Sequence, residues 1–195
     1  MPTVLKNLSQ KDAAIKVAAI EASSKIGQEL AWNDLMNVLK KGSPAEIKAV
    51  KTALLTMKDE GVVNRIATLL PTMPVSARPT LIEVLAERAA DDKIEVILTE
   101  LKTDDTPTKI AAFTALKSVV SDKDLPTLFA LLNTSVTPQE VEATQEAITV
   151  AIKSTGDGAS QTNALLAQMN TAPSDKRNHY LRILANIGGK KHSIL

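Results

Sequence analysis

The residues that could perform chemistry are few. The chain has two histidines, His179 and His192, and no cysteine. The histidines are thirteen residues apart, and neither stands beside a glutamate or three residues from one. Helical metal sites combine histidine and glutamate at such spacings, so the sequence predicts no metal ion. A Ser-His-Asp triad needs a histidine between a nucleophile and a carboxylate, whereas His179 follows a polar run and is expected at the surface.

Two acidic pairs and one glycine-rich turn are the remaining candidates for a site. The pairs Asp91-Asp92 and Asp104-Asp105 fall in predicted turns, where solvated capping carboxylates are more common than an acid–base couple. The segment 156–158, Gly-Asp-Gly, is too short to cradle a phosphate and follows no predicted strand. The sequence therefore favours a protein that is not an enzyme and needs no cofactor.

Charge and composition disfavour several further classes. Among 195 residues, 23 Lys and Arg balance 22 Asp and Glu, which leaves a net charge of +1. Nucleic-acid binding would then need a local basic patch. Aromatic residues are only 2% of the chain, too few for a platform that stacks bases or sugars. No apolar run is long enough to cross a membrane, and the N-terminus does not resemble a signal peptide, so the localisation stays unassigned.

Apolar residues recur every 31 positions. The first column holds Val4, Leu35, Ile66, Ile97 and Leu128, and the second holds Leu8, Leu39, Leu70, Leu101 and Leu132. An earlier block in each repeat holds Val50, Leu81 and Ala112, then Leu54, Leu85 and Leu116. Columns four residues apart lie on one face of a helix. Each repeat is therefore predicted to be a pair of short amphipathic helices, here called its first and second helix.

Prolines and capping boxes mark where the first helices begin. Pro44, Pro107, Pro138 and Pro173 stand at such starts, where a missing N–H is tolerated. Capping boxes begin at Ser43 and at Thr137. The predicted helices are 10–26, 29–40, 44–57, 60–70, 77–90, 92–102, 107–121, 124–132, 138–154, 160–170 and 173–187. Helices this short must be stabilised by stacking on neighbouring repeats.

Three segments resemble HEAT repeats, of the short kind found in phycobilisome-lyase-type modules. They run from Asp12 to Ala22, from Pro44 to Leu54 and from Leu181 to Gly189. The resemblance implies an all-α fold, a right-handed α-α superhelix of about five helical hairpins with partial repeats at its ends. The pattern departs from the family at Lys16 and Lys48, where many such repeats carry arginine. An Asp–Arg ladder between repeats is therefore not expected.

The domain prediction is one repeat domain over 1–195. Val4 and Leu8 fit a second helix whose first helix is missing, and 188–195 fits the start of an absent helix. We therefore expect the chain to be an excerpt of a longer protein. Apolar side chains near its ends, such as Ile183, Ile187 and Ile194, predict end-to-end self-association.

The second helices supply the candidate site, because in this fold they line the concave side. The predicted partner-binding face consists of Asp34, Asn37, Arg65, Thr68, Glu95 and Thr99. Such a polar surface with a single cation suits a protein or peptide better than phosphate. The favoured function is a non-catalytic protein-interaction scaffold, and a plain solvated helix face is the alternative that the residues leave open.

Two other functions remain open at this stage. HEAT-like glycosylases and nucleic-acid-binding proteins use tryptophan and aspartate on a basic concave face, and Trp32 with Asp34 resembles that pair. The chain could also be an accessory segment beside a catalytic domain. Lysines of the first helices are expected to be solvated rather than to form a nucleic-acid patch. They are Lys48, Lys51, Lys58, Lys109 and Lys117.

Overall fold

The computed structural model describes residues 7–8, 12–26, 28–59, 61–154 and 158–188. Within these residues the fold is all-α and contains no strand, as predicted. The helices are α2 (Ala13–Ile26), α3 (Gln28–Lys41), α4 (Pro44–Thr56), α5 (Gly61–Leu69), α6 (Arg78–Glu87), α7 (Ile94–Glu100), α8 (Thr106–Val119), α9 (Leu125–Thr134), α10 (Pro138–Ser154), α11 (Gly158–Thr171) and α12 (Arg177–Gly188). Every predicted helix has its counterpart.

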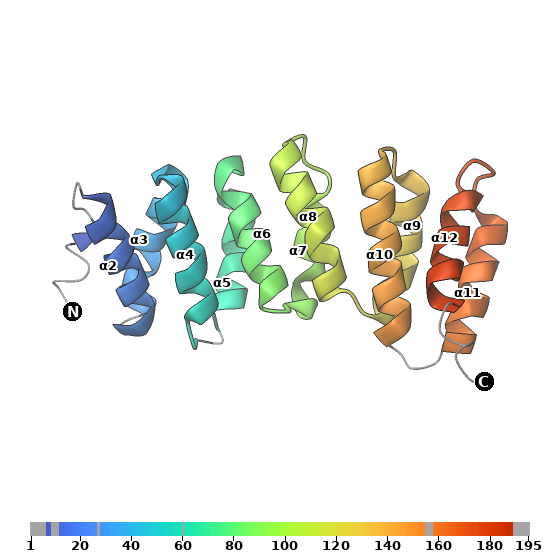
Figure 1. Ribbon diagram of the computed structural model, residues 1–195, viewed down its shortest axis with the longest axis horizontal. Coiled ribbons are helices and arrows are strands. Elements are labelled where there is room, and N and C mark those ends of the chain that lie inside the picture. The colour runs from blue at the N-terminus through green and yellow to red at the C-terminus, as the bar shows by residue number, and fades with distance from the viewer. Residues whose placement is uncertain (1–6, 9–11, 27, 60, 155–157, 189–195) are drawn as a thin grey trace, which may run out of the picture. The chain divides into compact units, whose positions relative to one another are not determined.

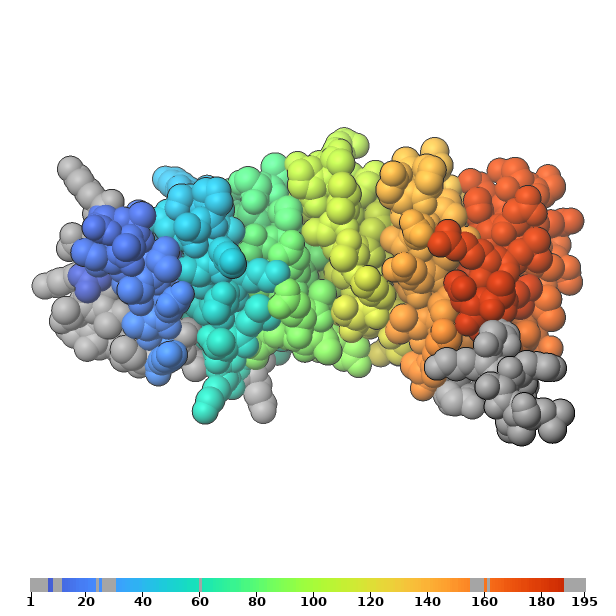
Figure 2. Space-filling view, viewed as in Figure 1, coloured from blue at the N-terminus to red at the C-terminus, as the bar shows by residue number. Residues whose placement is uncertain are grey.

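The chain divides into two compact units, residues 1–112 (unit 1) and 113–195 (unit 2). The boundary falls within α8. In unit 1, the first helices α2, α4 and α6 pack side by side, and the second helices α3 and α5 lie behind them (Figure 1). Within unit 1, the space-filling view shows α4 in contact with both α2 and α6 (Figure 2). The single repeat domain stays a prediction.

Unit 2 has the same alternation of first and second helices. Its first helix α10 packs against α9 and against the next first helix, α12. The second helix α11 packs against α12. This arrangement gives the molecule its helical-repeat character.

The apolar columns form the core. Leu35, Leu39, Ile66, Leu70 and Ile97 are at most 1% exposed, and so are Leu128 and Leu132 in unit 2. The earlier columns, from Val50 to Leu116, are buried as well. Val4 lies outside the described residues. The 31-residue spacing thus identified the buried positions correctly, because residues at equivalent positions of successive repeats pack against equivalent neighbouring helices.

The largest error in the boundaries is at the last helix. We expected it to begin at Pro173, but α12 begins at Arg177. Residues before it form a turn in which the Lys176 N–H donates to the carbonyl of Pro173. A proline that can open a helix can also open a turn, and local sequence does not distinguish the two.

Two arginines close equivalent turns with the same backbone contacts. Nε of Arg78 donates to the carbonyl of Met73, and its Nη2 donates to that of Pro71. Arg177 repeats both contacts, five and seven residues back, in unit 2. Only Arg78 also has a carboxylate partner within the described residues: its Nη1 lies 3.1 Å from Glu100, whose side chain is 3% exposed. A buried charge is thereby neutralised.

Helix α6 ends earlier than the predicted residue 90 because Ala89 has a left-handed backbone, with φ of 49°. This conformation costs an L-residue about 1–2 kcal/mol, whereas glycine adopts it freely. We predict that Ala89→Gly raises the free energy of unfolding of unit 1 by about 0.5–1 kcal/mol, after allowing for glycine's unfolded-state entropy. Urea unfolding followed by the fluorescence of Trp32, the only tryptophan, measures it.

The control for this substitution is Ala86→Gly, inside the same helix. There glycine relieves nothing, so we expect a loss of about 0.5–1 kcal/mol. Equal destabilisation by both substitutions would contradict the strain assigned to Ala89.

Candidate functional site

The six residues of the predicted face lie on second helices of unit 1, two on each helix. Helix α3 carries Asp34 and Asn37, α5 carries Arg65 and Thr68, and α7 carries Glu95 and Thr99. Four of the six are exposed, whereas Asp34 and Arg65 are half-buried. The structure brings Asp34 and Asn37 together on the wall of one pocket. That all six residues form one concave surface stays a prediction.

Arg65 is held by two contacts within unit 1. Its Nη2 lies 2.7 Å from Oδ2 of Asp59, and its guanidinium carbon lies 5.4 Å from the ring centroid of Trp32. The first contact neutralises the charge and the second joins α5 to α3. Trp32 is therefore part of a helix–helix contact, a role that sequence reasoning missed.

The two threonines of the face use their donors internally. The Thr68 hydroxyl donates to the carbonyl of Asn64, and that of Thr99 donates to the carbonyl of Glu95, both at 2.9 Å. Each hydroxyl oxygen keeps acceptor capacity on the exposed side of its helix. The threonines can therefore accept hydrogen bonds from a partner without any change in their own helix.

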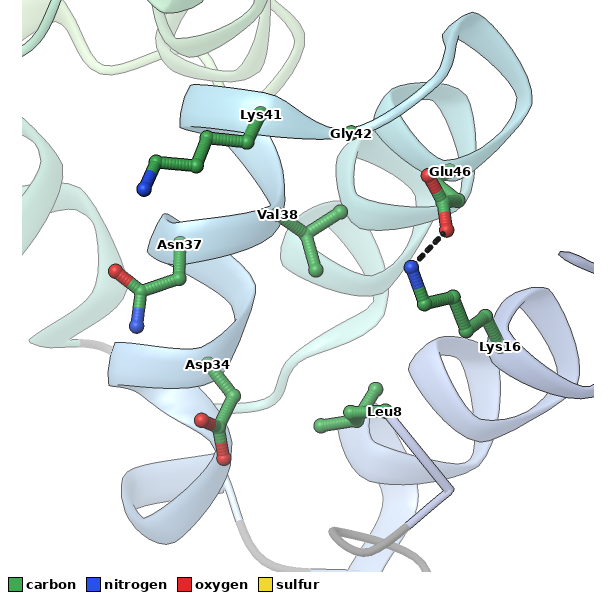
Figure 3. A pocket seen from close by; sticks show the side chains of 8 residues that line it. All are labelled: Leu8, Lys16, Asp34, Asn37, Val38, Lys41, Gly42 and Glu46. Atoms are coloured by element: carbon green, nitrogen blue, oxygen red, sulfur yellow. Dashed lines mark ion pairs between the residues drawn. The ribbon is translucent and has the colours of Figure 1, made fainter. Parts of the chain in front are cut away.

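The pocket has a volume of about 230 Å³ and lies between Leu8 and helices α2, α3 and α4 (Figure 3). Its wall consists of Leu8, Lys16, Asp34, Asn37, Val38, Lys41, Gly42 and Glu46. A side chain could not replace Gly42, because a Cβ there would lie 2.7 Å from the carbonyl oxygen of Val38. This glycine therefore lets the chain turn tightly at the end of α3.

One side of the pocket is an ion pair between first helices. Nζ of Lys16 in α2 lies 2.9 Å from Oε1 of Glu46 in α4. The other oxygen of Glu46 accepts from the Ser43 N–H at 2.7 Å and completes the predicted capping box. The hydrogen bonds from Lys16 and Ser43 outweigh the cost of burial and lower the pKa of Glu46 from 4.5 to about 2.

This lowered pKa predicts a pH dependence of stability. The folded state binds the Glu46 proton more weakly than the unfolded state, so its contribution is complete above pH 4.5. It is lost progressively as the pH falls to about 2. We predict that Glu46→Gln makes unit 1 less stable at pH 7 and reduces the loss of stability between pH 7 and pH 3. Urea unfolding followed by Trp32 fluorescence tests this.

Glu95→Gln is the matched control, because Glu95 is exposed and has no ion-pair partner in the described part of the chain. It should leave the pH profile of the wild type unchanged. An unchanged profile in Glu46→Gln would refute the assignment.

One of the lysines expected to be merely solvated, Lys51, is instead held in ion pairs between successive first helices. Lys48, Lys58 and Lys117 are exposed, as expected. Lys51 in α4 lies 2.7 Å from both Glu83 and Glu87 in α6. Burial opposes its charge, but the hydrogen bonds to the two glutamates outweigh that cost and raise the pKa of Lys51. In unit 2, Lys117 lies 3.7 Å from Glu146. Opposite charges about one repeat apart were the signal that could have revealed these pairs.

The remaining expectations about sites and ends have mixed outcomes. His179 is half-buried, and its backbone carbonyl accepts from Gln145; His192 and Ile194 lie outside the described residues. In the part described, no cluster of His, Cys, Asp or Glu is placed to hold a metal, and no helix is long and apolar enough to span a membrane. Leu8 and Ile183 are buried and Ile187 is half-buried, whereas Leu181 on α12 is 52% exposed; self-association stays a prediction.

Comparisons with known proteins identify a similar fold. No family model and no curated protein matches the chain. Among solved structures, the crystal structure of an engineered protein, a target of the Northeast Structural Genomics Consortium, is similar with a TM-score of 0.50 and 18% sequence identity. The match covers 96% of this chain and 96% of that one. At this identity the likeness concerns the fold alone.

Proposed function

We propose that this chain is a HEAT-like α-solenoid module, a right-handed superhelix that binds a protein or peptide and has no catalytic activity. The binding surface is the face of second helices in unit 1, defined by Asp34, Asn37, Arg65, Thr68, Glu95 and Thr99. The observation that supports the proposal is the chemical character of this face, which is polar and has a paired arginine. The exposed groups among these six residues are polar, and the one cation among the six, Arg65, is paired with Asp59.

The same observation separates a protein partner from a nucleic acid. Phosphate contacts require arginine or lysine that is free to bind. Neutral hydroxyls and amides instead match the donors and acceptors of a polypeptide. A face with acceptors on Thr68 and Thr99 and a carboxylate on Glu95 offers little to a phosphate backbone.

The test uses two variants with the same change of charge. Asn37→Glu/Thr68→Glu alters the proposed face, and Ala18→Glu/Thr52→Glu alters exposed positions on the first helices α2 and α4. A partner is captured from an extract of the source organism and purified, and its affinity for each form of the chain is measured by calorimetry. We expect at least tenfold weaker binding for the first variant and unchanged binding for the second.

Two results would contradict the proposal. One is equal affinity of the wild type and the Asn37→Glu/Thr68→Glu variant. The other is tight binding of duplex DNA at low salt that weakens steeply as salt is added, which would favour a nucleic-acid-binding protein instead.

A further inference from the structure

The pocket beside α3 is too small for most small-molecule ligands. Its volume of about 230 Å³ is below the roughly 300–1,000 Å³ of typical ligand sites. It has room for one amino-acid side chain of leucine size. Leu8 and Val38 supply apolar surface, and in Figure 3 both lie between the polar side of α3 and the Lys16–Glu46 pair.

The four charged residues around this pocket differ in whether they have an ion-pair partner. Lys16 and Glu46 neutralise each other. Asp34 and Lys41, by contrast, have no hydrogen-bond or ion-pair partner within the described residues. They are seven residues apart on one helix, which corresponds to about 10 Å along its axis. The pocket is thus flanked by one unpaired anion and one unpaired cation.

We propose that this pocket binds an aliphatic side chain of a partner polypeptide, with a cationic residue of the partner beside Asp34 and an anionic residue beside Lys41. This inference rests on the proposed function and names the chemistry of the partner at one end of the same face. An extended chain rises about 3.3 Å per residue, so residues two places to either side of a central leucine lie about 13 Å apart, and their flexible side chains can reach two charges about 10 Å apart. The amide of Asn37 lies between the two charges and can both donate and accept.

The probe is the capped peptide acetyl-Lys-Ala-Leu-Ala-Glu-amide, added to the full chain labelled with ¹⁵N. We expect shifts of backbone amide signals in α3 and at the start of α4, with millimolar affinity. Replacing the leucine of the peptide by serine should weaken binding about fivefold or more, since apolar burial is lost. Replacing its glutamate by lysine should weaken binding about threefold, the size expected of one exposed ion pair.

The matched change in the protein is Asp34→Lys, which leaves two cations beside the pocket. It should reverse the preference, so that acetyl-Glu-Ala-Leu-Ala-Glu-amide binds more tightly than the original peptide. Asp34→Asn serves as a second variant if the first perturbs the amide spectrum, and with it the acetyl-Lys-Ala-Leu-Ala-Glu-amide and acetyl-Glu-Ala-Leu-Ala-Glu-amide peptides should bind equally. Absence of binding at 10 mM peptide, or binding that ignores the leucine and Asp34, would overturn this inference. The proposed function would then still stand if the captured partner loses affinity for Asn37→Glu/Thr68→Glu.

Discussion

Replacing Arg78 with alanine is expected to lower the free energy of unfolding of unit 1 by about 3–5 kcal/mol. The substitution leaves Glu100 as a buried charge, because that side chain is 3% exposed and Arg78 is its ion-pair partner. It also removes the donors to the carbonyls of Met73 and Pro71. Urea unfolding followed by the fluorescence of Trp32 measures the loss, since this tryptophan lies in unit 1.

The chain contains its own control for this experiment. Arg177 makes the same two backbone contacts in unit 2, is exposed, and has no carboxylate partner among the described residues. Arg177→Ala should therefore cost unit 2 only about 1–2 kcal/mol, the net worth of two hydrogen bonds from a charged group that is open to solvent. Hydrogen exchange of amides in α12 measures this smaller effect.

A double substitution identifies the cause. Arg78→Leu/Glu100→Leu removes both charges together, so no buried charge is left unpaired. We expect it to recover most of the stability that Arg78→Ala loses. A double variant as unstable as Arg78→Ala would show that the backbone contacts of the arginine, and not its charge, carry the effect.

Replacing Tyr180 with alanine is expected to destabilise unit 2 by about 3–5 kcal/mol. The side chain of Tyr180 is fully buried on α12, and its ring lies 6.2 Å from that of Phe129. Its hydroxyl donates to Oδ1 of Asn133 at 2.9 Å. Truncation would therefore open a cavity among α9, α10 and α12. Hydrogen exchange of amides in α10 and α12 reports the loss in unit 2 directly.

Tyr180→Phe separates the ring from the hydroxyl. Phenylalanine fills the same volume and removes one hydrogen bond, whose partner Asn133 is partly exposed, so the expected cost is about 1 kcal/mol. If Tyr180→Phe were as destabilising as Tyr180→Ala, the hydrogen bond and not the packing would be the main contribution.

The all-α fold and its core followed from the sequence because each repeat presents the same face to its neighbours. A side chain such as Leu85 meets the same environment as Leu54, so a single spacing identifies both as interior. The capping box at Ser43 followed for a similar reason, because its hydrogen bonds are local. The start of α12 did not follow, because Pro173 opens a turn and a proline is equally compatible with the start of a helix.

Much of the candidate site could not be predicted from the sequence, because it depends on contacts between residues that are far apart in the chain. The pocket brings residues of α3 together with Lys16 of α2 and Glu46 of α4, which form an ion pair between two helices. Arg65 was correctly placed on a second helix, but its pairing with Trp32 joins residues from different repeats. The pairs of Lys51 with Glu83 and Glu87 could have been found by searching for opposite charges one repeat apart. The two glutamates are 32 and 36 residues from Lys51, so such a search must extend about one helical turn beyond the 31-residue period.

The central claim is that unit 1 recognises a polypeptide through its second helices. The most direct measurement places a photoreactive benzophenone amino acid at Thr68 on α5, and in a separate protein at Thr52 on α4, both exposed positions. Each protein is irradiated with the purified partner, and the cross-linked product is quantified. The account predicts efficient cross-linking from Thr68 and little from Thr52. Cross-linking from Thr52 alone would place the partner on the first helices and contradict the account.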